Sequence, residues 1–503
     1  MENGIARSIM FLGTGSDVGM SIAATAFCRI FKRRGFRVAP FKAQNMSNNS
    51  YVTIEGGEIG RAQVAQAEAA GLIPSVHMNP ILLKPSGKHG SQVVLQGKAL
   101  GTMPAGDYYG LKVRLRKIIR ESYNRLAREY ELIVMEGAGS CCEMNLKKSD
   151  LVNLPLAGDL NVPCVLVADI DRGGVFAQVI GSYHLMTGME RELIKGFLIN
   201  KFRGDAALFS SGIDYIEKRT LKPVFGVIPF FQDIHIDSED SVALQEDKRS
   251  PRAIGPRSVN IGVLRLPAIS NFTDFEVLDM EKDVVVNYLS SPAELSGDYD
   301  CFILPGSKNV IEDAVWMSHR GWKKAVRRFV KSGKRVLGIC GGYQLLGKRI
   351  KDPSGVESDR KEVSGLDLLP VETILAEEKV VRKVSGICLM NKKRIKGYEI
   401  HMGRTIILQE AGEPFLRIHG QGESGSRIDG WSLNRGQISG TYLHGILDSS
   451  GFRGEFLNSL RKTKGLKIRS SRQGRGSRFK QYDLLADHFE EHCDVEGIIQ
   501  LLN

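Results

Sequence analysis

The feature that most constrains the fold of this chain is a short apolar run that ends at a cysteine followed by two glycines. Residues 336–339 predict a buried strand, and residues 343–348, beyond Cys340 and the glycines, can begin a helix. The glycines permit a sharp turn between the two. A cysteine on such a turn is exposed, and the helix N-terminus stabilises its thiolate. The pattern predicts a nucleophile elbow, with a buried structural cysteine as the alternative.

A thiol nucleophile needs a base, and His444 is the residue that the sequence offers. It lies between two glycines in residues 440–448, about a hundred positions after Cys340. A base that is distant in sequence and near in space is typical of cysteine hydrolases. A lone histidine is more often a surface or core residue. Together with Cys340, however, it favours a cysteine–histidine catalytic pair.

These residues resemble the class I glutamine amidotransferase domain. The matching segments are Cys-Gly-Gly-Tyr-Gln at 340–344, Phe-Ile-Leu-Pro-Gly-Ser-Lys-Asn at 302–309, and His444. The resemblance implies that Cys340 attacks the side-chain amide of glutamine and that His444 transfers the proton. The loop after Pro305 would supply an N–H to the oxyanion. The glutamine-binding positions that the resemblance implies are Gln344, Gly306 and Gly341.

The group that would orient His444 departs from the pattern of that class. Most such domains carry a glutamate two residues after the histidine, and here that position is Ile446. The branch found in cobyrinic and cobyric acid synthases also lacks it. The orienting group is therefore open, with Glu399 and His401 as candidates. Both lie in residues 397–404, whose alternative interpretation is a polar strand end.

A second glycine-rich turn follows the first buried strand of the chain. Residues 8–12 predict that strand, residues 13–21 a loop, and the amphipathic segment through Phe31 a helix. Strand, glycine loop and helix is the arrangement that points backbone N–H groups at phosphates. The Walker pattern fails twice, because five residues rather than four separate the two glycines and Met20 takes the lysine position. A structural turn is the alternative.

The spacing of this loop resembles that of dethiobiotin synthetase and its relatives. Further matches are Pro-Phe-Lys at 40–42 and Met-Glu-Gly-Ala-Gly at 135–139. The ATP-binding positions that the resemblance implies are Gly13, Thr14, Ser16, Gly19, Ser21 and Lys42. It also implies Mg²⁺, held by Asp17 and Glu136. Taken singly, Asp17 has an alternative role as a helix cap, Lys42 as a solvated side chain and Glu136 as a strand end.

Length and composition limit the class of protein. The chain has 503 residues, enough for two or three domains, and its 42% hydrophobic and 25% charged residues are ordinary for a soluble protein. The eight cysteines form no paired metal-binding pattern, which favours a reducing compartment and argues against structural zinc. No apolar run approaches the roughly 18 residues of a membrane span, and the N-terminus lacks the plan of a signal peptide. We expect a cytoplasmic protein with no membrane partner.

The net charge of +12 would be compatible with nucleic-acid binding, but most of this charge lies in one short stretch of the chain. Residues 461–480 contain nine lysines and arginines and no acidic residue, so the rest of the chain carries only +3. A glycine- and serine-rich basic stretch with one aromatic residue, Phe479, is more often a solvated loop than a nucleic-acid arm. We therefore expect no nucleic-acid partner.

Strand and helix patterns alternate through both halves of the chain. This alternation predicts an α/β fold with mostly parallel sheets flanked by helices. We expect a P-loop-like synthetase domain at 1–236, a polar linker at 237–257 and a flavodoxin-like glutaminase domain at 258–452. Residues 453–503 are expected to add C-terminal helices and the basic loop. No internal repeat relates the two halves.

An ammonia-producing domain fused to a phosphate-binding domain implies an ATP-dependent amidoligase. From about residue 8 to residue 492 the chain resembles the cobyric acid synthase family. The segments that match in order and spacing are 16–19, 41–46, 57–61, 79–84, 168–174 and 200–204. The resemblance implies amidation of the b, d, e and g carboxylates of a corrinoid, adenosylcobyrinic acid a,c-diamide, with ATP and glutamine. The alternatives are a cobyrinic acid a,c-diamide synthase and a catalytically weakened corrinoid-binding protein. The sequence leaves open whether the chain forms a homo-oligomer.

Overall fold

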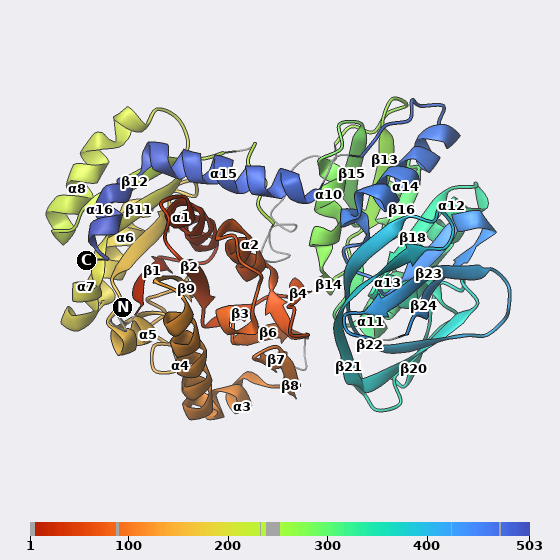
Figure 1. The fold of residues 1–503 in the computed structure, drawn as a ribbon, viewed down its shortest axis with the longest axis horizontal. Coiled ribbons are helices and arrows are strands. Elements are labelled where there is room, and N and C mark those ends of the chain that lie inside the picture. Colours follow the sequence, from red (N-terminus) through yellow and green to blue (C-terminus); the bar gives the residue numbers. More distant parts are fainter. Residues whose placement is uncertain are drawn as a thin grey trace.

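The computed structural model describes residues 6–86, 90–231, 233–237, 252–423, 425–471 and 474–502. Two α/β units lie side by side, and the C-terminal helices return from the second unit to the first (Figure 1). The predicted fold class, two units with mostly parallel sheets and flanking helices, is confirmed. Most of the expected linker at 237–257 lies outside the described residues, and the domain boundaries stay predictions.

The N-terminal unit is built on a six-stranded parallel sheet in the order β12-β11-β10-β1-β9-β2. Its strands are β1 (Arg7–Gly13), β2 (Val38–Lys42), β9 (Leu132–Ser140), β10 (Cys164–Asp169), β11 (Ile194–Phe202) and β12 (Val224–Pro229). Successive residues of a strand point to opposite faces. Accordingly Ile9 and Phe11 enter the core beneath α1, and Met10 and Leu12 enter the core on the other face. Burial on both faces explains why these strands are continuous apolar runs in the sequence.

Helices cover both faces of this sheet. They are α1 (Met20–Arg33), α2 (Arg61–Ala69), α3 (Ala105–Gly110), α4 (Lys112–Glu129), α5 (Leu154–Leu160), α6 (Val175–Leu185), α7 (Gly188–Leu193) and α8 (Ser210–Thr220). The amphipathic helix expected through Phe31 is α1, which buries Phe27 and Phe31 against the sheet and leaves Lys32 and Arg33 at its last turn.

Two small sheets extend the N-terminal unit toward its neighbour (Figure 1). Their strands are β3 (Gln44–Met46), β6 (Ile81–Pro85), β7 (Ser91–Leu95) and β8 (Lys98–Met103) in one sheet, and β4 (Ser50–Val52) and β5 (Glu58–Gly60) in the other. The strand pair predicted in this region is present as β6 and β7. The backbone N–H of Ser50 donates to Asn271 Oδ1 of the second unit over 2.9 Å. The Tyr51 and Tyr398 rings meet at 4.8 Å, so β4 forms part of the contact between the units.

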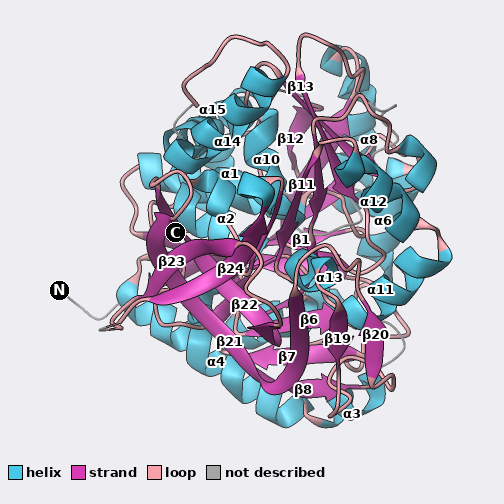
Figure 2. Cartoon of the chain, turned by 90° about the vertical axis from the view of Figure 1, so that its right-hand side faces the viewer, coloured by secondary structure: helices cyan, strands magenta, loops and turns pink. Residues whose placement is uncertain are grey.

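The C-terminal unit is built on an 11-stranded sheet that is parallel in one half and mainly antiparallel in the other, where only β19 and β21 pair in parallel (Figure 2). The parallel strands are β15 (Val284–Leu289), β13 (Val259–Leu264), β16 (Cys301–Leu304), β18 (Arg335–Ile339) and β25 (Ile438–Thr441). The other strands are β24 (Arg427–Leu433), β23 (Glu413–Gly420), β21 (Val371–Cys388), β22 (Arg394–Ile407), β19 (Arg349–Lys351) and β20 (Glu362–Ser364). Most of this half is not predicted from the sequence, because its long strands are not followed by glycine-rich turns into helices.

Shorter elements complete the second unit. A two-stranded pair, β14 (Ile269–Ser270) and β17 (Gly306–Ser307), lies beside the parallel strands. The helices are η4 (Phe272–Phe275), α10 (Glu276–Asp279), α11 (Val310–His319), α12 (Trp322–Lys331), α13 (Gly341–Leu346), η7 (Ile446–Asp448) and α14 (Ser450–Thr463). A single hydrophobic core joins these helices to the sheet, with Trp322 stacked on Phe302 at 5.6 Å.

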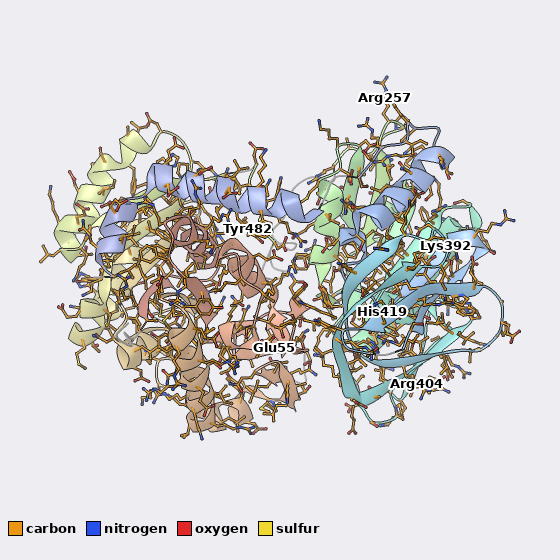
Figure 3. All side chains as sticks on the ribbon, viewed as in Figure 1. Glu55, Arg257, Lys392, Arg404, His419 and Tyr482 are labelled. Carbon is orange, nitrogen blue, oxygen red and sulfur yellow. The ribbon has the colours of Figure 1, made fainter. Side chains whose placement is uncertain are left out.

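The last long helix connects the two units. Helix α15 (Gly474–His492) runs along one edge of the molecule, and α16 (Val495–Gln500) ends the described chain (Figure 1). Near its start Arg478 faces Asp448 of the second unit over 3.4 Å. Further along, Tyr482 donates to Glu68 of the first unit over 2.8 Å (Figure 3), and Phe489 packs edge-on against Phe27.

The basic stretch at 461–480 differs from the solvated loop expected for it. Its first residues finish α14, and its last residues belong to α15, which begins at Gly474. Arg461 is fully buried and makes a two-pronged ion pair with Asp283 at 2.8 and 3.0 Å. The planar guanidinium matches a carboxylate in this geometry, which allows its burial. Part of the positive charge is therefore structural. Within the described residues no helix is long and apolar enough to cross a membrane.

Candidate functional site

Cys340 occupies the sharp turn between strand β18 and helix α13. Its backbone adopts φ 52° and ψ −110°, a conformation that residues other than glycine rarely populate. Close packing imposes this turn. A Cβ added at Gly342 would overlap the carbonyl of Leu304, and a Cβ at Gly338 would lie 2.6 Å from the carbonyl oxygen of Gly342. The contacts fix the Cys340 thiol at the N-terminal end of α13.

His444 lies beside Cys340 and is held by an aspartate that the sequence does not point to. Its Nδ1 is 2.7 Å from Oδ2 of Asp274, whose other oxygen accepts the N–H of Gly445 over 3.0 Å. His444 and Asp274 are almost completely buried. The ring of Tyr398 stacks on the imidazole at 5.3 Å. With Nδ1 occupied by Asp274, Nε2 is the nitrogen left to exchange a proton with the sulfur.

Neither residue considered from the sequence as the orienting group of His444 has that role. Glu399 forms ion pairs with Arg382, at 2.7 Å, and with Arg427. His401 directs its Nδ1 to the carbonyl of Gly403 over 2.8 Å. The candidate role of Glu399 and His401 is therefore wrong. Asp274 stands in a segment with no histidine or cysteine near it, 170 positions before His444, so no local pattern marks it.

The electrostatics of this group favour a charged histidine. Burial alone would lower the pKa of His444, but the carboxylate of Asp274 and the sulfur of Cys340 outweigh it and raise the pKa to about 10. The histidine is therefore an imidazolium at neutral pH. An imidazolium beside a cysteine sulfur stabilises the thiolate, which is the nucleophilic form.

The backbone around Cys340 provides the expected surroundings of an oxyanion. A Cβ added at Gly341 would lie 2.7 Å from the backbone nitrogen of Ser307, so the start of α13 faces strand β17 directly. Gly306 lies against His444, because a Cβ there would come within 3.2 Å of the imidazole. Gln344 donates to Tyr442 over 3.2 Å. The structure thus gathers Gly306, Gly341 and Gln344 around the cysteine.

The glycine-rich loop of the first unit lies at the C-terminal end of β1. Gly19 has φ 101°, and a Cβ there would overlap the side chain of Asn200. The thioether of Met20 folds back over Gly13: a Cβ at Gly13 would lie 2.8 Å from the Met20 sulfur. Met20 is 7% exposed and belongs to the core under α1. The loop therefore forms the expected turn, but it carries the apolar Met20 at the position where the Walker and dethiobiotin-synthetase loops have a lysine.

Three of the predicted nucleotide-site residues meet at one carboxylate. Glu136, in the middle of β9, accepts from Ser21 over 2.6 Å and from Lys42 over 2.8 Å, and its other oxygen accepts from Gln66 over 2.6 Å. Glu136 and Lys42 are buried. The partners of the carboxylate include the Lys42 cation and two neutral donors, and Gln66 is a neighbour that the sequence patterns do not indicate.

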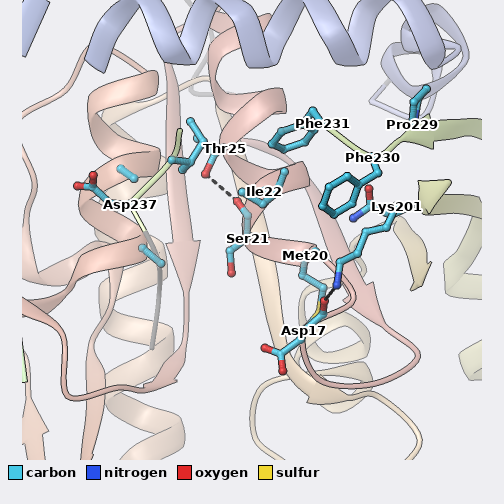
Figure 4. A pocket seen from close by; sticks show the side chains of 15 residues that line it. Asp17, Met20, Ser21, Ile22, Thr25, Lys201, Pro229, Phe230, Phe231 and Asp237 are labelled. Carbon is cyan, nitrogen blue, oxygen red and sulfur yellow. Dashed lines mark hydrogen bonds between the residues drawn. The ribbon is translucent and has the colours of Figure 1, made fainter. Parts of the chain in front are cut away.

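The remaining predicted loop residues lie apart from this cluster. Asp17 is exposed with φ 58°, and its carbonyl accepts from Lys201 over 2.5 Å (Figure 4). Ser16 is exposed as well, and Thr14 donates to Gln178 over 3.3 Å. The structure therefore brings Ser21, Lys42 and Glu136 together but does not join Asp17 to them.

A cavity of about 290 Å³ adjoins the loop (Figure 4). Its wall combines the polar residues Asn200, Lys201 and Asp237 with the rings of Phe230 and Phe231. Apolar walls with a few polar groups are typical of a small-molecule site. Lys201 joins the cavity to the loop, because its ammonium donates to the Asp17 carbonyl and also pairs with Asp169, at the end of β10, over 2.8 Å.

Comparison with known proteins agrees with this arrangement of two sites. Residues 260–452 match the family of CobB/CobQ-like glutamine amidotransferase domains, and residues 9–242 match the CobQ/CobB/MinD/ParA nucleotide binding domain. The first match contains Cys340 and His444, and the second contains the glycine-rich loop and Glu136.

Curated relatives match over nearly the whole chain. A cobyric acid synthase of Syntrophobacter fumaroxidans is 48% identical, and one of Chlorobium phaeobacteroides is 46% identical; each alignment covers 99% of this chain and 99% of the relative. A third, from Streptococcus sanguinis, is 46% identical with the same coverage. The prediction of a glutamine-dependent amidoligase is confirmed, and the chain belongs to the cobyric acid synthase family.

Proposed function

We propose that this enzyme amidates the b, d, e and g carboxylates of adenosylcobyrinic acid a,c-diamide, using ATP and the ammonia of glutamine, within cobalamin biosynthesis. The observation that carries the proposal is the Asp274–His444–Cys340 group in one unit of a chain whose other unit holds the loop and Glu136. The choice of corrinoid rests on 48% identity over 99% of a cobyric acid synthase.

The first half-reaction takes place at Cys340. Its thiolate attacks the side-chain amide carbon of glutamine, and the N–H groups near Gly341 and Ser307 stabilise the oxyanion. His444 donates its Nε2 proton to the departing nitrogen, so ammonia leaves and a thioester remains. Water, deprotonated by His444, then attacks the thioester and releases glutamate and the free thiolate. Asp274 holds the imidazole in the tautomer and orientation that both proton transfers require.

The second half-reaction takes place at the loop. ATP transfers its γ-phosphoryl group to a corrinoid carboxylate, and ammonia displaces phosphate to leave the amide. Backbone N–H groups of residues 15–19, at the N-terminus of α1, would bind the phosphates, since the N–H of Thr14 already donates to the Val167 carbonyl over 3.0 Å. Lys42, and the nearby Lys201, supply positive charge.

Mg²⁺ fits the donors at this end of the loop. The Ser21 hydroxyl and the Glu136 carboxylate are adjacent oxygen donors of the type that Mg²⁺ prefers. Mg²⁺ in nucleotide sites is usually held by one or two protein donors and takes its remaining ligands from phosphates and water. When bound, the ion neutralises phosphate charge. Asp17 would reach it only across the loop.

A product analysis tests the proposed substrate. The purified protein is incubated with the a,c-diamide, MgATP and glutamine, and the mass of the corrinoid product is measured by mass spectrometry. We expect up to four added amides, and little a,c-amidation when fully carboxylated cobyrinic acid is supplied. The opposite pattern identifies a cobyrinic acid a,c-diamide synthase. Corrinoid binding without any amidation identifies a corrinoid-binding protein that has lost catalysis.

A further inference from the structure

The cavity in front of Cys340 contains more charge than the glutaminase chemistry uses. It is small, about 40 Å³, and its wall includes the two catalytic side chains and Gln344. Four charged residues also line it: Lys84 from the first unit, and Lys308, Glu357 and Lys379 from the second. None of these four takes part in the proton transfers between Cys340 and His444.

Two of the lysines already share a carboxylate. Lys84 and Lys379 both donate to Glu58, one to each carboxylate oxygen and each over 2.5 Å. Ser50 and Gln92 complete this buried group with further hydrogen bonds. A carboxylate between two ammonium groups, all within hydrogen-bond distance, forms a structural cluster across the boundary of the two units, with one positive charge in excess.

Lys308 and Glu357 are different, because they face the same cavity without pairing. Glu357 accepts the N–H of Val310 with Oε2 over 2.7 Å, which fixes its carboxylate at the start of α11. Lys308 follows Ser307, the residue whose backbone nitrogen faces Gly341. Among the described residues, no ion pair within 4.0 Å joins the Lys308 ammonium to Glu357.

Both side chains are half-buried, and the loss of water around them in the cavity makes each charge costly. It lowers the pKa of Lys308, with the attraction of Glu357 opposing the shift. It raises the pKa of Glu357 to about 7, with the attraction of Lys308 again opposing the shift. Each group therefore gains from a partner of opposite charge placed in the cavity. A partner with one positive and one negative group satisfies both at once.

Glutamine is such a partner, since its α-carbon carries an ammonium and a carboxylate at the end opposite the reactive amide. We propose that Lys308 binds the α-carboxylate and Glu357 binds the α-ammonium group of glutamine, and that the pair restricts this site to the free amino acid. The proposal rests on the glutaminase half of the proposed function. A simple primary amide, or a glutamine within a peptide, would leave at least one of the two charges buried and unmatched.

Substrate analogues separate the two contacts. Glutaramate lacks the α-amino group, and 4-aminobutanamide lacks the α-carboxylate. We expect Lys308→Met and Glu357→Gln each to raise the KM for glutamine about 10- to 100-fold, as expected for a hydrogen bond to a charged group. Glu357→Gln should narrow the preference for glutamine over glutaramate, and Lys308→Met the preference for glutamine over 4-aminobutanamide. Amidation driven by added ammonia should stay unchanged in both variants.

Binding provides a readout that needs no turnover. Glutamine binding to full-length Cys340→Ala is measured by calorimetry, alone and combined with Lys308→Met or Glu357→Gln, with the exposed Lys324→Met as control. We expect the two cavity variants to weaken binding and the control to leave it unchanged. Unchanged affinity and unchanged analogue preference would overturn the assignment while leaving the proposed function intact. A wild-type enzyme that hydrolyses no glutamine would instead overturn the glutaminase half of the proposed function.

Discussion

The two sites of this chain differ in how much of their chemistry the folded protein supplies by itself. At Cys340 the nucleophile, its base and the acid that orients the base are in contact and buried. At the glycine-rich loop the residue in the lysine position is Met20, and Asp17 lies exposed and apart from Glu136. The glutaminase site is therefore complete without ligand, whereas the loop site depends on what ATP and its metal ion bring.

The difference follows from the two kinds of chemistry. Thiol attack on an amide needs a few atoms held in one geometry, so burial and close packing around Cys340 suit it. Phosphoryl transfer needs positive charge spread around a highly charged ligand, and that charge can come from several side chains and an ion. Replacement of one lysine by a neutral residue, as at position 20, is therefore expected to reduce the reaction rate less than the loss of any side chain of the Asp274–His444–Cys340 group.

The substitution with the largest expected effect on the difference between the two sites is Cys340→Ala. We expect it to abolish glutaminase activity and glutamine-supported amidation, because no other group in the cavity can form the thioester. Amidation with added ammonia should continue, since the loop site is separate. Steady-state rates with the two nitrogen sources check this. Glutaminase activity retained in the variant would remove Cys340 from its assigned role.

Asp274→Asn should produce the next largest effect. The variant keeps the size of the side chain but removes the charge that holds His444, and we expect glutaminase turnover to fall by about 10²–10⁴, the usual contribution of a positioned acid–base group. Asp298→Asn, on an exposed turn, is the control. If Asp274→Asn retained full turnover, a different group would have to orient the histidine.

The same variant gives a test by pH. Because the folded-state pKa of His444 is raised to about 10, its charged form stabilises the protein fully below the unfolded pKa of about 6.5, and this stability is lost as the pH rises through 10. The difference in free energy of unfolding between wild type and Asp274→Asn should therefore be largest near pH 6 and shrink toward pH 10. Urea unfolding at a series of pH values measures it. A difference that is constant with pH would show that Asp274 does not act through the charge of His444.

Lys42→Met tests the ATP-binding loop site. Loss of one phosphate-stabilising contact commonly costs on the order of 10²–10³ in rate, and we expect that loss in ATP-dependent amidation with no change in glutaminase turnover. The variant also leaves Glu136 without its buried cation, which alone costs about 3–5 kcal/mol in stability. Lys42→Met combined with Glu136→Gln removes that cost. Because Glu136 is also the proposed Mg²⁺ ligand, the double variant reports on stability alone, and a wild-type rate of ATP-dependent amidation in Lys42→Met would show that Lys42 is not a phosphate contact.

The sequence predicts the elements that local patterns define. The apolar run and glycines before and after Cys340 give β18 and α13, and the loop at 13–21 gives the β1–α1 turn. Both patterns are local, because the strand, the turn and the helix are consecutive. The resemblance to known families adds His444, since its motif has a fixed place relative to the cysteine.

The sequence does not reveal what only tertiary packing decides. Asp274 becomes the partner of His444 because η4 packs beside η7, a contact between segments with no shared pattern. Arg461 is buried because Asp283, far from it in sequence, provides a matching carboxylate. Composition alone assigns such an arginine to a solvated loop. Partners distant in sequence are therefore the main source of error.

The smallest expected effect concerns Met20. Its thioether is neutral and a weak acceptor, so it cannot place a charge beside the β- and γ-phosphates as the usual lysine does. The side chain lies against Gly13, which means that an unbranched lysine of similar length can follow the same path into the loop. We expect Met20→Lys to tighten ATP binding or raise ATP-dependent amidation.

The gain should be about tenfold or less, because Lys42 and Lys201 already bring two positive charges to the loop and a third adds less than the full strength of one charged hydrogen bond. Met20→Leu, which keeps an apolar side chain of similar size, should match wild type. Glutaminase turnover at Cys340 should be equal in all three proteins. Steady-state kinetics of both half-reactions would decide the point: if Met20→Lys leaves the ATP parameters unchanged, phosphate binding here does not depend on a cation at this position, and the existing lysines already complete the loop site.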